Sequence, residues 1–79
     1  GWGIQVGAFG AREEASRAAD AAREKLPKEL AHAQALPPQA QSGGAVHRAR
    51  LGNLSEQQAR LACRKLVQGN QPCFVFQVN

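Results

Sequence analysis

The sequence is poor in the residues that catalysis, metal binding and membrane insertion require. Only two cysteines and two histidines occur in 79 residues, and their spacing fits neither a zinc site nor a Cys–His nucleophile pair. No apolar run approaches the roughly 18–20 residues that span a bilayer. No acid, base and nucleophile are arranged for a reaction. We therefore expect no enzyme activity, no catalytic residue, no metal, no cofactor and no membrane insertion by this segment.

The chain is also too short for more than one domain. A chain of 79 residues buries only about 60–65% of its unfolded surface, so its core is modest. It has no initiator methionine and no signal peptide, and strand-like sequence begins at Trp2. We expect residues 1–79 to be one monomeric domain, excised from a longer protein.

Acidic residues are missing around two of the arginines. The net charge of +4 allows an anionic partner without identifying one. Between residues 12 and 24 arginines alternate with acids, as on a solvated helix face. Arg48 and Arg50, in contrast, stand in a strand-like segment with no acid nearby in the sequence.

Hydrophobic periodicity predicts two helices and four strands. In chain order the expected elements are strand 2–9, helix 11–26, strand 30–36, strand 45–51, helix 56–68 and strand 73–78. Ser55 and Gln58 form a capping box at the start of the second helix. Two prolines and two glycines make 37–44 a loop, which we expect to be mobile at the edge of the sheet.

This order of elements is the split βαβ plan (βαββαβ) of ferredoxin-like and RNP-like α+β folds. Because crossover connections are right-handed, the third strand lies between the first and the second, and the antiparallel sheet has the order 4-1-3-2. Both helices then cover one face of the four-stranded sheet, and the other face is open.

Alternation along the strands predicts which side chains lie on the open face. It places Gln5 and Gly7 of the first strand there, together with Val46, Arg48 and Arg50 of the third strand.

The last strand has two possible registers of similar core energy. If Cys73 pairs with Cys63 on the buried stripe of the second helix, Phe74 and Phe76 lie on the open face. The opposite register buries both phenylalanines and exposes Val75. A disulfide favours the first register.

An amide, two guanidinium groups and an aromatic ring on one face suit a sugar polymer. Gln5, Arg48 and Arg50 can bond hydroxyl and acetamido groups, and Phe74 can stack on the apolar face of a sugar ring. A solvated sheet face and a protein-interaction module are alternatives. A single-stranded nucleic-acid binder is a further one, but no aromatic faces outward from the first or third strand, and the RNA-recognition signature is absent.

Two segments resemble the SPOR domain, the sporulation-related repeat: "WGIQVGAFGAREEASRAA" and "HRARLGNLSEQQARLACRKL". The usual family pattern is an aromatic, V-Q-V/L-G-S/A-F and a helix, then Y-R-V-x-V/L-G-P and a second helix, and the resemblance covers residues 2–78. It implies the βαββαβ fold and non-catalytic binding of peptidoglycan glycan strands that lack stem peptides. It also implies a periplasmic domain that targets a parent protein to septal or remodelled cell wall.

Carried over residue by residue, the resemblance implies that Gln5 is the polar residue of the glycan groove and that Gly7 lets a sugar approach the backbone. Arg48 falls on the arginine of the third strand, and Phe74 falls where the family often has an apolar residue of the groove. Together with the alternation, the predicted glycan-binding residues are Gln5, Gly7, Val46, Arg48, Arg50, Phe74 and Phe76.

Three positions depart from the family pattern. Ala8 stands where serine is common, Val46 where some members have an aromatic, and Asn53 where proline is usual. Binding is therefore expected to depend more on Phe74 and the arginines.

The chain also resembles SPOR domains at the C-terminus of periplasmic D-alanyl-D-alanine carboxypeptidases, in which a cysteine in the second helix and another opening the last strand recur. This implies a peptidoglycan enzyme as parent. Because the second helix and the last strand meet across a short loop, and because a periplasmic location is oxidising, we expect a disulfide between Cys63 and Cys73.

Overall fold

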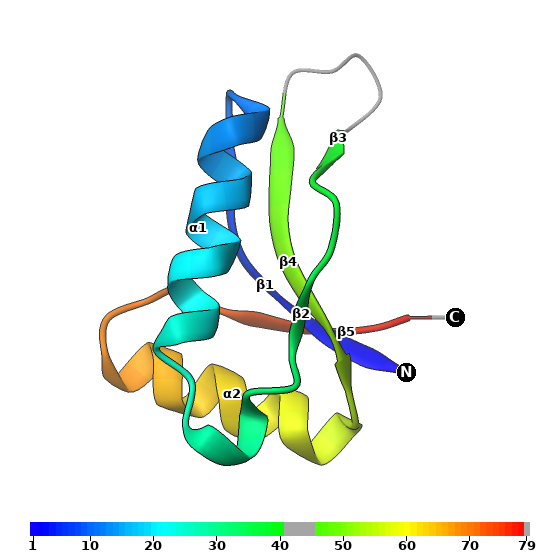
Figure 1. Cartoon of the computed structure of the whole chain (residues 1–79), viewed down its shortest axis with the longest axis vertical. Helices are drawn as coiled ribbons and strands as arrows, with labels where there is room; N and C mark the ends of the chain where they lie inside the picture. Colours follow the sequence, from blue (N-terminus) through cyan, green and yellow to red (C-terminus); the bar gives the residue numbers. More distant parts are fainter. Residues whose placement is uncertain (41–45, 79) are drawn as a thin grey trace.

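The computed structural model describes residues 1–40 and 46–78. It consists of one antiparallel sheet with two helices on one of its faces (Figure 1). The elements are β1 (Trp2–Phe9), α1 (Arg12–Glu24), the 3-10 helix η1 (Lys28–Leu30), β2 (Gln34–Ala35), β3 (Gln39–Ala40), β4 (His47–Leu54), α2 (Glu56–Gln68) and β5 (Phe74–Gln77). The sheet order β2-β4-β1-β5 is the predicted 4-1-3-2 order read from the other edge. The predicted fold class is confirmed.

The helices bury stripes of mostly small residues against the sheet. In α1 the buried residues are Ala15, Ala19 and Ala22, which recur at helical spacing and allow the helix to lie close to β1 and β4. In Figure 1, α1 stands upright and α2 crosses below it. The opposite sheet face therefore carries no helix among the described residues.

The predicted capping box of α2 is present. The amide of Gln58 donates to the Ser55 hydroxyl at 3.1 Å, and the amide of Ser55 donates to the Gln58 side-chain oxygen at 2.9 Å. Two N–H groups that the helix itself leaves unpaired are thereby satisfied. This cap fixes where α2 begins, directly after the end of β4.

The second strand is shorter than predicted. Residues 28–30 form η1, in which the Leu30 amide donates to the Pro27 carbonyl at 2.9 Å. Leu30 and Ala33 are both buried, three residues apart, so the apparent alternation over 30–36 is largely a helical-turn pattern. Only Gln34–Ala35 pair as β2 with β4.

The predicted loop 37–44 is wrong at Gln39–Ala40, because these two residues form β3. This strand pairs with His47 and Arg48, so β2 and β3 border the same edge of β4. Between them lie two prolines, which have no N–H to donate to the ladder and therefore interrupt the strand. Residues 41–44 of the predicted loop lie outside the described residues.

β4 carries one extra residue near its end. Trp2 pairs with Leu54 and Ile4 with Leu51, so two steps along β1 correspond to three along β4. Within this bulge Asn53 has φ 64°, in the left-handed region. Asparagine tolerates this region, whereas proline is held near φ −65°. The departure from the family proline at this position is therefore consistent with the backbone.

β1 carries an extra residue in turn, at Val6. Gln5 pairs with Arg50, and Gly7 pairs with the adjacent Ala49, so two steps along β1 match one along β4. The bulge reverses the alternation of β1 from Gly7 onward. Gly7 lies opposite the buried Ala49, on the helix-covered face, and not on the open face as predicted.

The predicted disulfide is present and fixes the register of β5. Cys63 of α2 is bonded to Cys73, which directly precedes β5, with a Cα–Cα distance of 5.2 Å. Val75 pairs with Ile4 and packs against the core. Phe74 has the opposite parity, and 68% of its surface is exposed.

Candidate glycan-binding face

A row of three side chains crosses the open face on neighbouring strands. Gln5 of β1 pairs with Arg50 of β4 on one side and with Phe74 of β5 on the other. Directly opposed residues of an antiparallel pair project to the same face, so amide, guanidinium and phenyl groups lie side by side. Gln5 and Arg50 are half-buried, while Phe74 is largely exposed.

A second cross-strand pair, Gly3 and Phe76, lies beside this row. Sequence reasoning did not single out Gly3. Gly3 pairs with Phe76, and a Cβ built at Gly3 would lie 2.7 Å from Cζ of the Phe76 ring. The ring therefore lies over the backbone of β1, in the space that a side chain would fill. The sequence does contain a signal that could have identified Gly3: it is a glycine inside a strand, near an aromatic residue of the adjoining strand.

The Phe76 ring also contacts the guanidinium of Arg50. Cζ of Arg50 lies over the ring, 5.5 Å from its centroid, in cation–π geometry. The ring thus extends from β5 across β1 toward β4. As a result Phe76 is half-buried, whereas Phe74 projects freely from the same strand.

The remaining predicted residues of β4 lie beside this row and this pair. Arg48 pairs with Ala8 and is half-buried. Val46 directly precedes β4 and is half-buried, outside the strand pairing. Arg48 therefore extends the face along β4, and Val46 borders it.

Gly7 has a different neighbour from the one predicted. A Cβ at Gly7 would lie 2.8 Å from Cε2 of Phe9, and Phe9 packs against the core. A side chain at Gly7 would meet the Phe9 ring, and this close approach accounts for glycine at this position. This follows from the bulge at Val6, which places Gly7 and Phe9 on the helix-covered side.

Gln71 holds the bulged part of β1 and was also missed. Its side-chain Nε2 donates to the carbonyl oxygen of Val6 at 2.8 Å, in a partly buried setting. The β1–β5 pairing ends at Gln5 and Phe74, so Gln71 supplies a bond just beyond the end of that ladder. Gln71 therefore helps to set the position of Gln5.

The open face is positively charged without a counter-charge on its own strands. β1, β4 and β5 contain Arg48 and Arg50 and no acidic residue. Neither arginine side chain forms a hydrogen bond or salt bridge with another described residue. Nε of Arg50 is buried and has no partner among those residues. The face thus offers hydrogen-bond donors that the described protein leaves unused.

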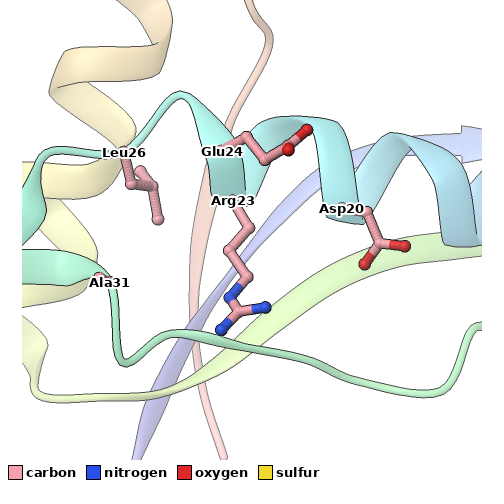
Figure 2. A pocket seen from close by; sticks show the side chains of 5 residues that line it. All are labelled: Asp20, Arg23, Glu24, Leu26 and Ala31. Carbon is pink, nitrogen blue, oxygen red and sulfur yellow. The ribbon is translucent and has the colours of Figure 1, made fainter.

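A hollow of about 610 Å³ lies elsewhere, beside the end of α1 (Figure 2). Its lining residues are Asp20, Arg23, Glu24, Leu26 and Ala31. In Figure 2 the side chains of Asp20 and Arg23 project from one side of α1, and Glu24 projects from the other. Its lining has exposed charges of both signs and no aromatic, and includes none of the predicted site residues. We therefore place the candidate site on the open face.

Comparison with protein families agrees with this fold. The model of the SPOR domain matches residues 1–77. The chain belongs to the SPOR domain family. SPOR domains are peptidoglycan-binding modules and not enzymes. The comparisons with curated proteins and with solved structures gave no match.

Family membership also bears on location. A SPOR domain implies binding at the cell wall, and the Cys63–Cys73 disulfide fits an extracytoplasmic setting. None of the helices in the described part of the chain has the length and apolar composition needed to cross a bilayer.

Proposed function

We propose that the open face of this SPOR domain binds peptidoglycan glycan strands that lack stem peptides. The observation that carries this proposal is the row of Arg50, Gln5 and Phe74 across three adjacent strands. It combines a neutral hydrogen-bonding group, a planar cation and an exposed aromatic ring. These groups match the hydroxyl, acetamido and apolar surfaces of an amino-sugar polymer.

Gln5 and Phe74 of the row and the neighbouring Phe76 have separate tasks. Gln5 lies between the other two and is half-buried, so its amide is held for bonding to an acetamido or hydroxyl group. Phe74, 68% exposed, offers a stacking surface for a sugar ring. Phe76 lies lower, over Gly3, and forms an apolar floor beside the row.

Preference for stripped strands has a steric basis. In an intact strand each stem peptide projects from the sugar that must approach the sheet. A shallow face offers no space for the peptide, so intact strands are rejected by clash.

The domain would act as a targeting module for a longer protein. By binding stripped strands, it would bring its parent to septal or remodelled cell wall in the periplasm. The resemblance to SPOR domains of periplasmic D-alanyl-D-alanine carboxypeptidases supports a peptidoglycan enzyme as that parent. We expect the domain itself to be monomeric.

A single-stranded nucleic acid is the competing ligand for a positive face of this fold. RNA-recognition domains stack bases on aromatics of their two central strands. Here the aromatics of β1, Trp2 and Phe9, pack against the core, and β4 has none. Both aromatics of the open face come from the edge strand β5, which favours the glycan.

Co-sedimentation with purified sacculi tests the proposal. More protein should sediment with sacculi whose stem peptides an amidase has removed than with untreated sacculi. Gln5→Ala should reduce this binding, and Arg17→Ala, on the exposed side of α1, should not. Equal binding to treated and untreated sacculi would contradict the preference, and tighter binding to a single-stranded oligonucleotide would favour nucleic acid.

A further inference from the structure

The acidic residues are confined to the helical layer of the domain. All six acids of the chain lie on helices: Glu13, Glu14, Asp20, Glu24, Glu29 and Glu56. The open face has Arg48 and Arg50 instead, with no acid on β1, β4 or β5. A wholly neutral polymer would not call for two cations that lack a partner among the described residues, because desolvating them costs more than desolvating amides. The arginines therefore indicate a ligand with negative charge.

Arg50 is positioned before any ligand arrives. Its guanidinium carbon lies over the Phe76 ring, 5.5 Å from the centroid, and the group carries several N–H donors. These donors make no hydrogen bond to a described residue, and Nε is already out of solvent. A planar fork of this kind matches a carboxylate better than it matches a hydroxyl group.

A stripped glycan strand carries such a carboxylate. Its N-acetylmuramic acid residues have a lactyl group whose carboxyl is joined to the stem peptide through an amide bond. When water splits that bond, the amine leaves with the peptide and a free carboxylate stays on the sugar. In the intact strand the same carbon belongs to a neutral amide. Removal of the peptide therefore creates one negative charge on each such sugar.

We propose that Arg50, assisted by Arg48, recognises this lactyl carboxylate. The inference rests on the proposed binding of stripped strands, and it adds charge recognition to steric exclusion as the source of selectivity. Arg48 and Arg50 are two residues apart on one face of β4, which separates their Cα atoms by about 7 Å. Both side chains can thus approach one carboxylate or the sugars on either side of it.

Two oligosaccharides of equal size separate this inference from the proposed function. One is a defined naked glycan oligomer with free lactyl carboxylates, and the other has each carboxylate converted to a primary carboxamide. Neither carries a peptide, so steric exclusion treats them alike. Calorimetric titration of the oxidised domain should show about tenfold or greater preference for the carboxylate form, as a charge-assisted bond would give.

Three matched variants assign the preference to residues. Arg50→Gln and Arg48→Gln remove a charge and keep an amide, and Arg17→Gln makes the same change on the exposed side of α1. Arg50→Gln should reduce the carboxylate preference to about threefold or less, and Arg48→Gln should reduce it partly. Arg17→Gln should leave it unchanged. Because the ratio of two affinities is measured on one protein, a modest loss of stability does not alter it.

The outcomes distinguish the two proposals. Equal binding of both oligomers by the unmodified domain overturns carboxylate recognition and leaves the proposed function intact. Failure of both oligomers to bind overturns both. A carboxylate preference that persists undiminished in Arg50→Gln and Arg48→Gln overturns the assignment to these arginines.

Discussion

Gly3 shows how the absence of one side chain shapes the open face. A Cβ at this position would lie 2.5 Å from the Leu51 carbonyl oxygen and 2.7 Å from the Phe76 ring. The backbone contact has no freedom to relax, and the ring would have to leave β1. Because Phe76 also contacts Arg50, its displacement would disturb the guanidinium as well.

Gly3→Ala should therefore destabilise the domain by about 1–3 kcal/mol through overpacking, and should weaken glycan binding. Gly10→Ala is the matched control, since no atom lies within 4 Å of a Cβ built there. Urea unfolding of both variants measures the difference. A Gly3→Ala domain as stable as Gly10→Ala would show that the ring and strand shift without cost.

The central row gives a second prediction at the residue scale. Gln5→Ala should weaken binding of a naked glycan oligomer by about 1–2 kcal/mol, because polar groups of the sugar would be left unpaired. Phe74→Ala should cost a similar or larger amount through lost stacking. Calorimetry with Arg17→Ala as control checks this. If only Arg17→Ala weakens binding, the site is on the helical side.

Among the elements, β1 shows which structural features the sequence predicts and which it does not. The split βαβ order, the α2 cap and the open-face position of Gln5 follow from periodicity and capping, which are local, whereas the position of Phe74 also depended on the expected Cys63–Cys73 disulfide. A bulge is not local, because its position depends on the register of a partner strand far along the chain. Alternation counted through Val6 therefore assigned Gly7 to the wrong face.

The second strand was misjudged for a related reason. Residues 30–36 alternate in hydrophobicity, yet Leu30 and Ala33 are buried at helical-turn spacing after Pro27. Over so few residues, a strand pattern and a turn of helix bury overlapping sets of positions. The pairing of β3 likewise depends on contact with β4, which composition alone does not reveal.

The bulge in β1 is held by a side chain that can be removed. Gln71→Ala should destabilise the domain by about 1–2 kcal/mol, because a partly buried carbonyl of Val6 would lose its donor. Gln68→Ala, on an exposed position of α2, is the control and should change stability by less than about 0.5 kcal/mol. Denaturant midpoints compare the two. Equal midpoints would mean that water replaces the Gln71 amide without loss.

The link between α2 and β5 gives a further prediction. Cys63 and Cys73 are ten residues apart, and closing such a loop contributes about 2–3 kcal/mol. Reduction, or the pair Cys63→Ala and Cys73→Ala, should lower the urea midpoint accordingly. Because β5 is an edge strand that carries Phe74 and Phe76, glycan affinity should fall too. An unchanged midpoint after complete reduction would show that β5 pairing alone fixes this edge.

In the whole molecule, a net charge of +4 is divided between a mixed helical layer and an open face with arginines alone. Because the open face carries only two cations, the salt dependence of ligand binding to this face has an upper limit. A ligand held by two arginines and several neutral contacts releases few ions on binding. A protein that neutralises 6–10 phosphates of DNA loses about 10³–10⁵ in affinity between 50 and 200 mM salt.

Glycan binding by this domain should therefore weaken by about tenfold or less over that salt range, since only Arg48 and Arg50 supply charged contacts. The slope of log affinity against log salt should become shallower in Arg50→Gln, and should not change in Arg17→Gln, which keeps the open face intact. Titrations at four salt concentrations give these slopes. A loss of a thousandfold would require many more ionic contacts than the open face offers, and would point to a polyanion bound across the helical layer as well.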